Sequence, residues 1–214
     1  MNTGVLLVSA VFAIAYGFRW NAHAPSRART LLKTSPVLLL ALMAMLAASP
    51  GLIVAGLLFS ALGDFFLSRE DDRSFLIGMI AFLAAHLAYI GVFLQAGTPA
   101  LVLGERLPGA LGLVAVAMLA ILYLWPGLGA FRLPVLVYTL AILGMGLSAL
   151  GLALSLPHVL ALLGAGSFVL SDSLLAIGKF RPDGWVSRVR AAPGLVWFSY
   201  WGAQALIASA FRGI

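Results

Sequence analysis

The sequence predicts an all-α integral membrane protein: one compact bundle of eight transmembrane helices forming a single membrane-embedded domain over residues 1–214. The chain is 63% hydrophobic and only 9% charged, whereas a soluble domain carries about 25% charged residues. Its mean hydropathy is +1.09. Apolar runs of about 20 residues, the length at which a helix crosses a bilayer, fill almost the whole chain. A soluble globule of this size has too little interior to hide them.

Hydropathy and helix-breaking residues divide the chain into the eight predicted spans. Proline marks three boundaries, at Ser49-Pro50-Gly51, Trp125-Pro126-Gly127 and Leu156-Pro157, because it is tolerated in the first turn of a helix and disrupts the interior. The first apolar run has no positive residues before it, so it is interpreted as a retained span and not as a signal peptide. The predicted spans are residues 3–19, 33–48, 51–68, 74–95, 108–125, 132–152, 157–178 and 192–211.

The distribution of basic residues predicts the orientation. Connections after the first, third, fifth and seventh spans hold eleven Lys and Arg residues, and the opposite side holds only Arg106 and Arg212. Basic loops stay in the cytoplasm, so both termini are expected outside it, in the cell membrane (the inner membrane of a bacterium). The net charge of +6 is therefore a topology signal, and no nucleic-acid partner is expected.

A faint internal repeat is also present. PVLLLALMAML from Pro36 resembles PVLVYTLAILG from Pro134, and FSALGD in the third span resembles FVLSD in the seventh. Two four-helix halves in the same orientation would be related by an axis along the membrane normal. Apolar sequences also match by chance, so an unrepeated bundle stays the alternative.

Few ionisable residues remain inside the predicted spans. Asp64 and Asp172 lie in the third and seventh spans, His86 lies in the fourth, and Lys33 lies at the inner edge of the second. A charged group at membrane depth costs at least roughly 2.5–3.5 kcal/mol on insertion scales, so each such residue is a hypothesis of a functional site.

The depths of these residues predict a cavity that opens toward the cytoplasm. Asp64 and Asp172 lie about 5–8 residues from the inner ends of their spans, roughly 7–12 Å at 1.5 Å per residue. The polar residues expected near them, on the fourth, sixth and eighth spans, are Tyr89, Tyr138, Ser199, Tyr200 and Gln204.

Two carboxyls close together in a low dielectric cannot both ionise cheaply, so the pair is expected to share a proton and to act as both acid and base. The alternative is structural: each aspartate caps a broken helix or pairs with Lys33 or an arginine. His86 by itself is more typical of a packed, hydrogen-bonded side chain than of a ligand. With three histidines and no cysteine, neither a metal nor another cofactor is expected.

Four stretches follow one another over nearly the whole chain: FSALGDFFL, FLIGMIAFLAAHLAYIGVF, GSFVLSDSLLAIGKF and WFSYWGAQALIASA. In these stretches, and in their order and spacing, the chain resembles the YhhN family of multi-span proteins, which includes the TMEM86-like lysoplasmalogenases. Lys33 with Pro36, and Pro134 with Tyr138, fit the pattern between them.

The resemblance implies a hydrolase that cleaves the vinyl ether bond of lysoplasmalogens to a fatty aldehyde and glycerophosphoethanolamine or glycerophosphocholine. The family's intramembrane aspartates correspond to Asp64 and Asp172 as catalytic residues. The residues expected to contact the lysophospholipid substrate are Lys33, His86, Tyr89, Tyr138, Ser199, Tyr200 and Gln204.

Protonation of the vinyl ether β-carbon by a carboxylic acid, followed by attack of water, requires no metal. The substrate phosphate would lie at the inner interface, near the cations of Lys33, Arg132, Lys179 and Arg181. Two alternatives stay open: a metal-dependent lipid hydrolase with Asp64, Asp172 and His86 as ligands, and a transporter of lipids or small molecules in which the aspartates relay protons.

Overall fold

The computed structural model describes residues 2–212, and all regular secondary structure in this part of the chain is helical. The predicted all-α fold is therefore confirmed. The long helices are α1 (Asn2–Ala15), α2 (Arg27–Leu46), α3 (Gly51–Leu67), α4 (Asp72–Ala96), α6 (Leu107–Leu124), α7 (Arg132–Leu150), α8 (Leu156–Phe180) and α10 (Ala192–Ala210). The short elements are the π-helical turn η1 (Tyr16–Trp20), α5 (Ala100–Leu103), the 3-10 turns η2 (Trp125–Gly127) and η3 (Gly129–Phe131), and α9 (Trp185–Arg188).

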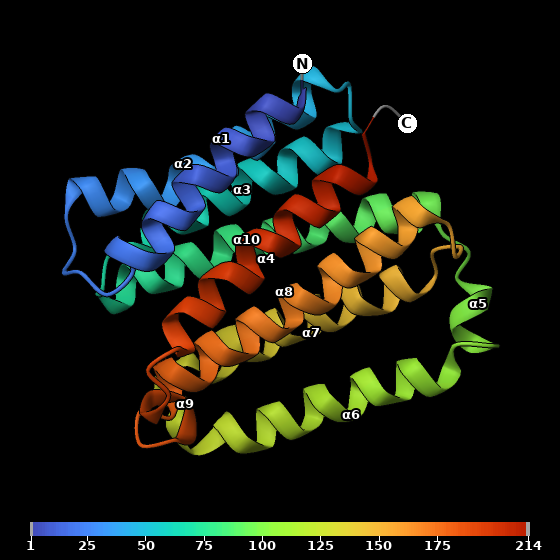
Figure 1. Ribbon diagram of the computed structural model, residues 1–214. Helices are drawn as coiled ribbons and strands as arrows, with labels where there is room; N and C mark the ends of the chain where they lie inside the picture. Colours follow the sequence, from blue (N-terminus) through green and yellow to red (C-terminus); the bar gives the residue numbers. More distant parts are fainter. Residues whose placement is uncertain (1, 213–214) are drawn as a thin grey trace.

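The long helices run side by side along one axis, and consecutive ones alternate in direction (Figure 1). Helices α1, α2 and α3 form one side of the bundle, α10 and α4 lie in the middle, and α8 and α7 follow. Helix α6 lies at the opposite edge, where it packs mainly on α7. Both ends of the chain lie at the same end of the bundle, so the loops fall into two groups, one at each end.

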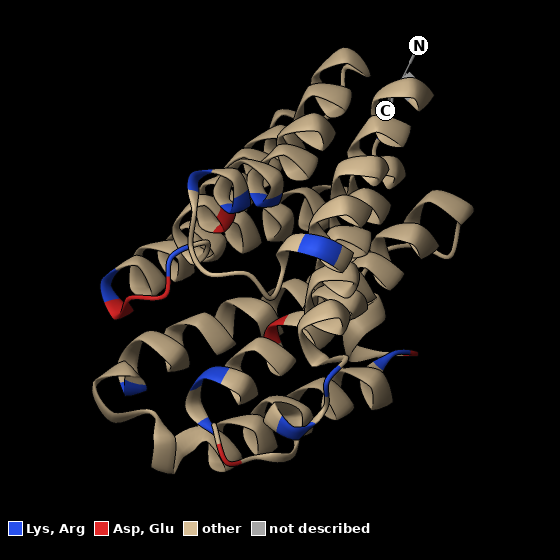
Figure 2. Ribbon diagram, turned by 60° about the vertical axis from the view of Figure 1, so that its left-hand side comes forward, with Lys and Arg blue, Asp and Glu red and all other residues tan. Residues whose placement is uncertain are grey.

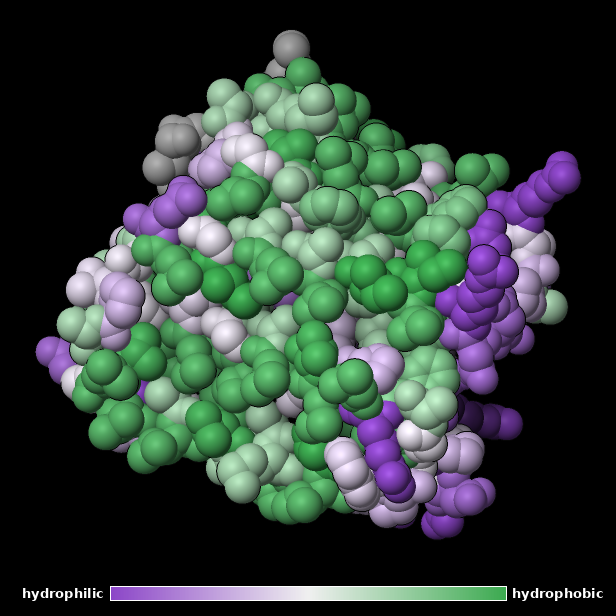
Figure 3. Space-filling model, turned by 180° about the vertical axis from the view of Figure 1, so that it is seen from behind, coloured by the Kyte–Doolittle hydropathy of each residue, from purple (hydrophilic) through white to green (hydrophobic). Residues whose placement is uncertain are grey.

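The loops at the end away from the termini carry most of the basic residues, as the sequence predicts. Figure 2 shows Lys and Arg mainly around these connections. Figure 3 shows a broad apolar face with hydrophilic residues gathered toward the same end. Large apolar side chains face outward on α6, where Leu119 and Leu122 are 65% and 67% exposed. An apolar surface of this kind is suited to lipid and not to water.

Within the described part of the chain, six helical segments are long and apolar enough to cross a membrane: Thr3–Trp20, Arg27–Leu46, Asp72–Ala96, Leu107–Gly127, Gly129–Leu150 and Leu156–Phe180. Helix α3 is equally apolar but has only 17 residues. The structure thus supports a multi-pass membrane protein with six or seven such helices. The eighth span, the side on which the termini lie and the internal repeat stay predictions.

Most span boundaries match the predicted ones within a few residues, but the second does not. Helix α2 begins at Arg27, six residues before the predicted start at residue 33. The side chain of Ser26 accepts a hydrogen bond from the Arg29 backbone N–H at 3.1 Å, which is a helix N-cap. Lys33 therefore lies inside the helix, six residues after its first residue, and not at the edge where it is predicted. The short helices α5 and α9 were not predicted.

Small residues let neighbouring helices approach closely where α8 meets α10. A Cβ atom at Gly164 would lie 2.7 Å from Ile207 Cγ1 and 3.0 Å from the Ala203 carbonyl oxygen. Glycine is required by this close approach, which is typical of helix packing in lipid. The contact holds α10, with its tyrosine and tryptophans, against the middle of the bundle.

Candidate active site

A polar cavity of about 570 Å³ lies at the basic end of the bundle, between α2, α3, α8 and α10. Both intramembrane aspartates, Asp64 and Asp172, line it. The two aspartates therefore share one cavity. Its walls carry more cations than anions, because the basic residues Arg29, Lys33, Arg69, Lys179 and Arg190 face three carboxylic acids, Asp64, Glu70 and Asp172.

Asp64 lies on the α2 and α10 side of this cavity. It is 1% exposed, and the Tyr200 hydroxyl donates a hydrogen bond to its Oδ2 at 2.7 Å. Lys33 Nζ lies 4.0 Å from its Oδ1. Lys33 reaches this position because α2 begins early and places the lysine in its second turn. A lysine and an aspartate this close form an ion pair that lowers the cost of burying both charges.

Asp172, on α8, has different neighbours. The Tyr138 hydroxyl of α7 donates a hydrogen bond to Asp172 Oδ2 at 2.8 Å. The imidazole Nε2 of His86 lies 3.5 Å from the same oxygen. Within residues 2–212, His86 is the one basic group within 4.0 Å of this carboxyl.

His86 is fully buried and its orientation is set by its own helix. Its Nδ1 lies 2.6 Å from the backbone carbonyl oxygen of Phe82, one turn earlier on α4. The edges of its ring pack against Phe168 and Tyr138. A carbonyl oxygen can only accept, so Nδ1 carries the hydrogen and Nε2 is left to face Asp172.

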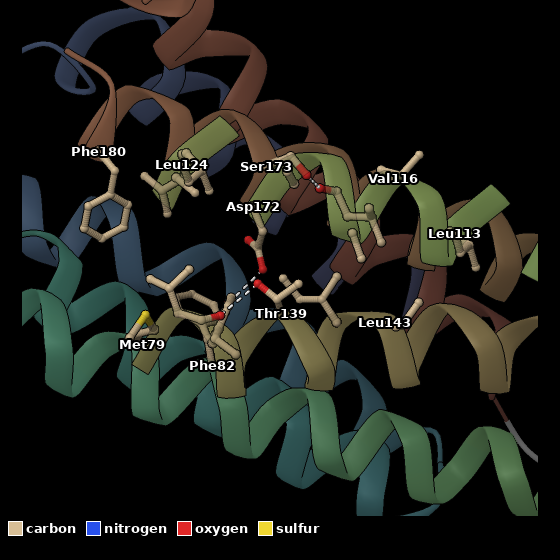
Figure 4. Close-up of a pocket in the computed structure, with 18 of the residues that line it drawn as sticks. Met79, Phe82, Leu113, Val116, Leu124, Thr139, Leu143, Asp172, Ser173 and Phe180 are labelled. Atoms are coloured by element: carbon tan, nitrogen blue, oxygen red, sulfur yellow. Dashed lines mark hydrogen bonds between the residues drawn. The ribbon is translucent and has the colours of Figure 1, made fainter. Parts of the chain in front are cut away.

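A second, apolar pocket of about 90 Å³ lies between α4, α6, α7 and α8. Figure 4 shows Asp172 pointing into it, with Leu113, Val116 and Leu143 farther along the same pocket. Asp172 also lines the polar cavity. The residues that line both are Leu67, Phe75, Phe82, Asp172 and Leu175. Asp172 is thus the acidic residue at the boundary between a charged cavity and an apolar one.

The two aspartates face one cavity without touching. Among the described residues no hydrogen bond joins Asp64 to Asp172; each accepts one from its own tyrosine. Asp64 lies three residues before the end of α3 at Leu67, and Asp172 lies eight before the end of α8 at Phe180. The two carboxyls therefore make no contact through which they could share one proton directly. Each carboxyl instead accepts a hydrogen bond from a tyrosine hydroxyl of a neighbouring helix.

Two of the other predicted residues lie behind the cavity. The Tyr89 hydroxyl donates to Gln204 Oε1 at 2.5 Å, and Gln204 Nε2 donates to Ser60 Oγ at 2.8 Å. Neither Tyr89 nor Gln204 lines the polar cavity or the apolar pocket. Their hydrogen bonds tie α4 and α10 to α3 one turn from Asp64, so they support the site without facing into it.

Ser199 does not line the polar cavity, although its neighbour Tyr200 does. Its hydroxyl donates to the Leu195 carbonyl oxygen of its own helix at 2.6 Å. It lines a separate apolar hollow on the far face of α10. Successive residues of a helix are about 100° apart around the axis, so Ser199 and Tyr200 cannot both face Asp64.

Two of the four cations predicted at the interface also lie elsewhere. Arg132 stacks on the Trp125 ring and Arg181 on the Tyr123 ring, at 5.0 and 4.9 Å from the ring centres. Neither lines the polar cavity, whereas Lys33 and Lys179 do. Lys179 is paired with Asp72 at 2.7 Å, which leaves Lys33 as the lysine nearest the carboxyls.

Arg29 is a cavity residue that the sequence prediction missed. It is only 9% exposed, and its Nη1 donates to the Ser68 carbonyl oxygen and to Glu70 Oε1, both at 3.2 Å. Arg29 and Lys33 are four residues apart, so in a helix they share a face. Ser26, a good N-cap residue, was the available signal that the helix begins early enough to include both.

The donor set of the site offers little to a metal ion. Among residues 2–212, no three His, Cys, Asp or Glu side chains cluster closely enough to hold one. His86 and Asp172 lie together, but Asp64 pairs with Lys33 instead.

Comparisons with known proteins agree with these motifs. The YhhN family profile matches residues 28–211. A protein of Mycobacterium bovis named lysoplasmalogenase is 33% identical over 162 residues, which is 74% of this chain and 59% of that protein. Two proteins named lysoplasmalogenase TMEM86A are each 34% identical to this chain. The match to the Bos taurus protein covers 73% of this chain and 63% of that protein. The match to the Homo sapiens protein covers 87% of this chain and 79% of that protein.

The matched part of this chain thus spans 59% of the length of the mycobacterial relative and 63% of the bovine one. No solved structure gives a significant match.

Proposed function

Since the chain belongs to the YhhN family, we propose that it is an intramembrane hydrolase that cleaves the vinyl ether bond of a lysoplasmalogen. The products are a fatty aldehyde and glycerophosphoethanolamine or glycerophosphocholine. The names of relatives from a mycobacterium, cattle and humans support this substrate class.

The observation that carries the proposal is the position of Asp172 between the two cavities. A lysoplasmalogen has one long alkenyl chain, a vinyl ether bond and then a polar glycerophosphate head. With the first carbons of the chain in the apolar pocket and the head in the polar cavity, the vinyl ether lies where the two meet. Asp172 is the acidic residue that lines both.

The walls of each cavity suit the part of the lipid assigned to them. The apolar pocket is lined almost wholly by aliphatic and aromatic side chains, and burying each methylene of the chain contributes about 0.8 kcal/mol. In the polar cavity, Lys33 and Arg29 offer the phosphate a cation each, and arginine can bind it through two hydrogen bonds.

The chemistry needs an acid and a base but no cofactor. Protonation of the double bond creates an oxocarbenium ion, and water then attacks the carbon bonded to oxygen. The carboxyls of Asp64 and Asp172 are the two groups proposed for these tasks. Each is oriented by one tyrosine hydroxyl.

We place the polar cavity on the cytoplasmic side of an eight-span bundle. Its mouth is lined by basic connections, including Arg69 and Arg190, and basic connections stay in the cytoplasm. The substrate would then enter from the inner leaflet.

Mass spectrometry of the products tests the proposal. Purified protein is incubated with a matched panel of vinyl-ether, alkyl-ether and ester lysolipids. We expect fatty aldehyde and a glycerophospho-alcohol from the vinyl-ether lipid alone, and none after Asp172→Asn. Asp183→Asn, in the exposed loop after α8, is the matched control and should retain activity.

Other outcomes would decide for the alternatives. Release of fatty acid from the ester lipid would identify a lysophospholipase. Loss of aldehyde release on chelation would indicate a metal-dependent hydrolase. Movement of lysolipid across a vesicle membrane with no product formed would indicate a transporter.

A further inference from the structure

We infer that the two aspartates have different, fixed tasks: Asp172 delivers the proton to the β-carbon of the vinyl ether, and Asp64 is the anion that accepts a proton from the attacking water. This assignment rests on the proposed function and goes beyond it, because vinyl ether hydrolysis by itself does not say which carboxyl is the acid. Three observations support it.

The first observation is the hydrogen-bonding requirement of His86. Its Nδ1–H donates to the Phe82 carbonyl oxygen at 2.6 Å, so in a neutral ring Nε2 bears a lone pair. That lone pair faces Asp172 Oδ2 at 3.5 Å, and Nε2 is otherwise buried without a hydrogen-bond partner. A lone pair and a carboxylate oxygen repel each other. A proton held by Asp172 and directed at Nε2 turns this contact into an attraction.

The second observation is the cation beside Asp64. Lys33 Nζ lies 4.0 Å from Asp64 Oδ1, and the Tyr200 hydroxyl donates to Oδ2 at 2.7 Å. Both neighbours favour the carboxylate form. Asp172 has a tyrosine donor as well, but it has no lysine or arginine within ion-pair distance among the described residues. The two carboxyls therefore differ in the charge of their partners.

The third observation is the direction in which the lipid lies. In a 1-alkenyl ether the β-carbon, which receives the proton, belongs to the chain side of the bond. The carbon that water attacks is bonded to the ether oxygen and lies on the head side. Asp172 lines the apolar pocket and Asp64 does not. Asp64 lines only the polar cavity, from which water reaches the bond.

The reaction then proceeds with all protons accounted for. The Asp172 carboxyl proton is transferred to the β-carbon, whose π electrons form the new C–H bond and leave an oxocarbenium ion. Water attacks the carbon bonded to oxygen and gives one proton to the Asp64 carboxylate, forming a hemiacetal. Asp172 removes the hemiacetal hydroxyl proton while Asp64 returns its proton to the departing glycerol oxygen. Aldehyde and alcohol form, and both carboxyls regain their starting states.

His86 acts in this scheme as a positioning residue. It does not line either cavity, so it does not touch the lipid. Its Nε2 faces Asp172 Oδ2 and favours the protonated form of this carboxyl, while the Tyr138 hydroxyl donates to the same oxygen from α7. Replacement of His86 should slow proton delivery without changing lipid affinity.

Deuterium incorporation separates the two tasks. The wild-type protein, Asp64→Asn and Asp172→Asn are each incubated with vinyl-ether lysolipid in heavy water. Released aldehyde is reduced at once to the alcohol, and both the recovered lipid and the alcohol are analysed by mass spectrometry. Asp64→Asn should still place deuterium on the β-carbon, chiefly in recovered lipid, because the oxocarbenium ion reverts. Asp172→Asn should place none in either. Adding His86→Asn to Asp64→Asn should slow this labelling at least several-fold with lysolipid binding unchanged.

The assignment would be overturned if lipid recovered from Asp172→Asn contained deuterium. It would also be overturned if neither the lipid nor the alcohol from Asp64→Asn contained deuterium. The wild-type protein shows whether such a result refutes only the assignment or also the proposed function. Wild-type protein that releases aldehyde while the two variants show the reverse pattern refutes only the assignment. Wild-type protein that releases no aldehyde refutes the proposed hydrolysis and the assignment with it. Retained binding of the lysolipid by each variant shows that it is folded.

Discussion

The surroundings of Asp64 and Asp172 differ in charge, although both carboxyls line one cavity and each accepts a hydrogen bond from a tyrosine. Asp64 has a lysine at 4.0 Å and faces only the polar side. Asp172 has an imidazole at 3.5 Å and also faces the apolar pocket. Two aspartates that line one cavity thus become chemically different through their neighbours.

The largest expected effect is on activity. Asp172→Asn and Asp64→Asn should each lower aldehyde release by ~100-fold or more, since a positioned acid or base contributes roughly 10²–10⁴-fold. The measurement is the initial rate of aldehyde release in detergent. Turnover near the wild-type rate by either variant would contradict the two-carboxyl mechanism. The variant Asp183→Asn controls for a general effect of removing a carboxylate.

The next effect is on stability, and here the two variants should differ. Asp64→Asn leaves Lys33 buried without its anion, and breaking a buried ion pair costs roughly 3–5 kcal/mol. Asp172→Asn replaces a neutral acid by a neutral amide, so its cost should be about 1 kcal/mol. Unfolding in detergent measures both. Restoration of most of the lost stability by Lys33→Met in the Asp64→Asn background would confirm the pair, and equal costs of the two single variants would contradict the charge difference.

The tyrosines provide a smaller contrast. Tyr200→Phe removes a hydrogen bond to a charged acceptor, worth roughly 1.5–3 kcal/mol, whereas Tyr138→Phe removes one to a neutral acid, worth roughly 0.5–1.5 kcal/mol. We expect kcat to fall more in Tyr200→Phe than in Tyr138→Phe, with KM nearly unchanged in both. The opposite order of kcat values would argue that Asp172 is the anion.

The smallest effect concerns the apolar pocket. Ala120 of α6 lines it, so Ala120→Trp should fill part of its volume and raise KM for a long-chain substrate by about tenfold, and less for a short-chain one. Leu119→Trp is the matched control, because Leu119 is 65% exposed on the neighbouring face of the same helix. Equal KM changes in the two variants, or a KM change that does not depend on chain length, would contradict the placement of the substrate chain in this pocket.

Much of the arrangement follows from counting along the sequence. Apolar runs predict the helices, and the distance of Asp64 and Asp172 from the span ends predicts a shared cavity. Tyr138 and Tyr200 were expected at the same level, and they donate to the two carboxyls. Distance along a helix follows from residue number and rise per residue, but it also depends on where the helix ends: Asp64 lies three residues before the end of α3 and Asp172 eight before the end of α8.

Rotation about each helix axis could not be predicted in the same way. Ser199 and Tyr200 are equally deep, but only Tyr200 faces Asp64. Lys33 was placed at a helix edge because the cap at Ser26 was overlooked, and Arg29 was missed for the same reason. The partner of each carboxyl depends on how neighbouring helices are turned, which packing contacts such as Gly164 against Ile207 determine.

The proposed mechanism requires that a lysolipid lies across both cavities with its reacting bond at Asp172. This placement can be measured by photocrosslinking with a non-hydrolysable alkyl-ether lysolipid that carries a diazirine a few carbons from the ether oxygen, followed by peptide mapping. We predict labelling of pocket residues on α6 and α7, such as Leu113, Val116 and Leu143, and loss of that labelling in Ala120→Trp but not in Leu119→Trp. Labelling confined to α1, α2 and α3 would contradict the account.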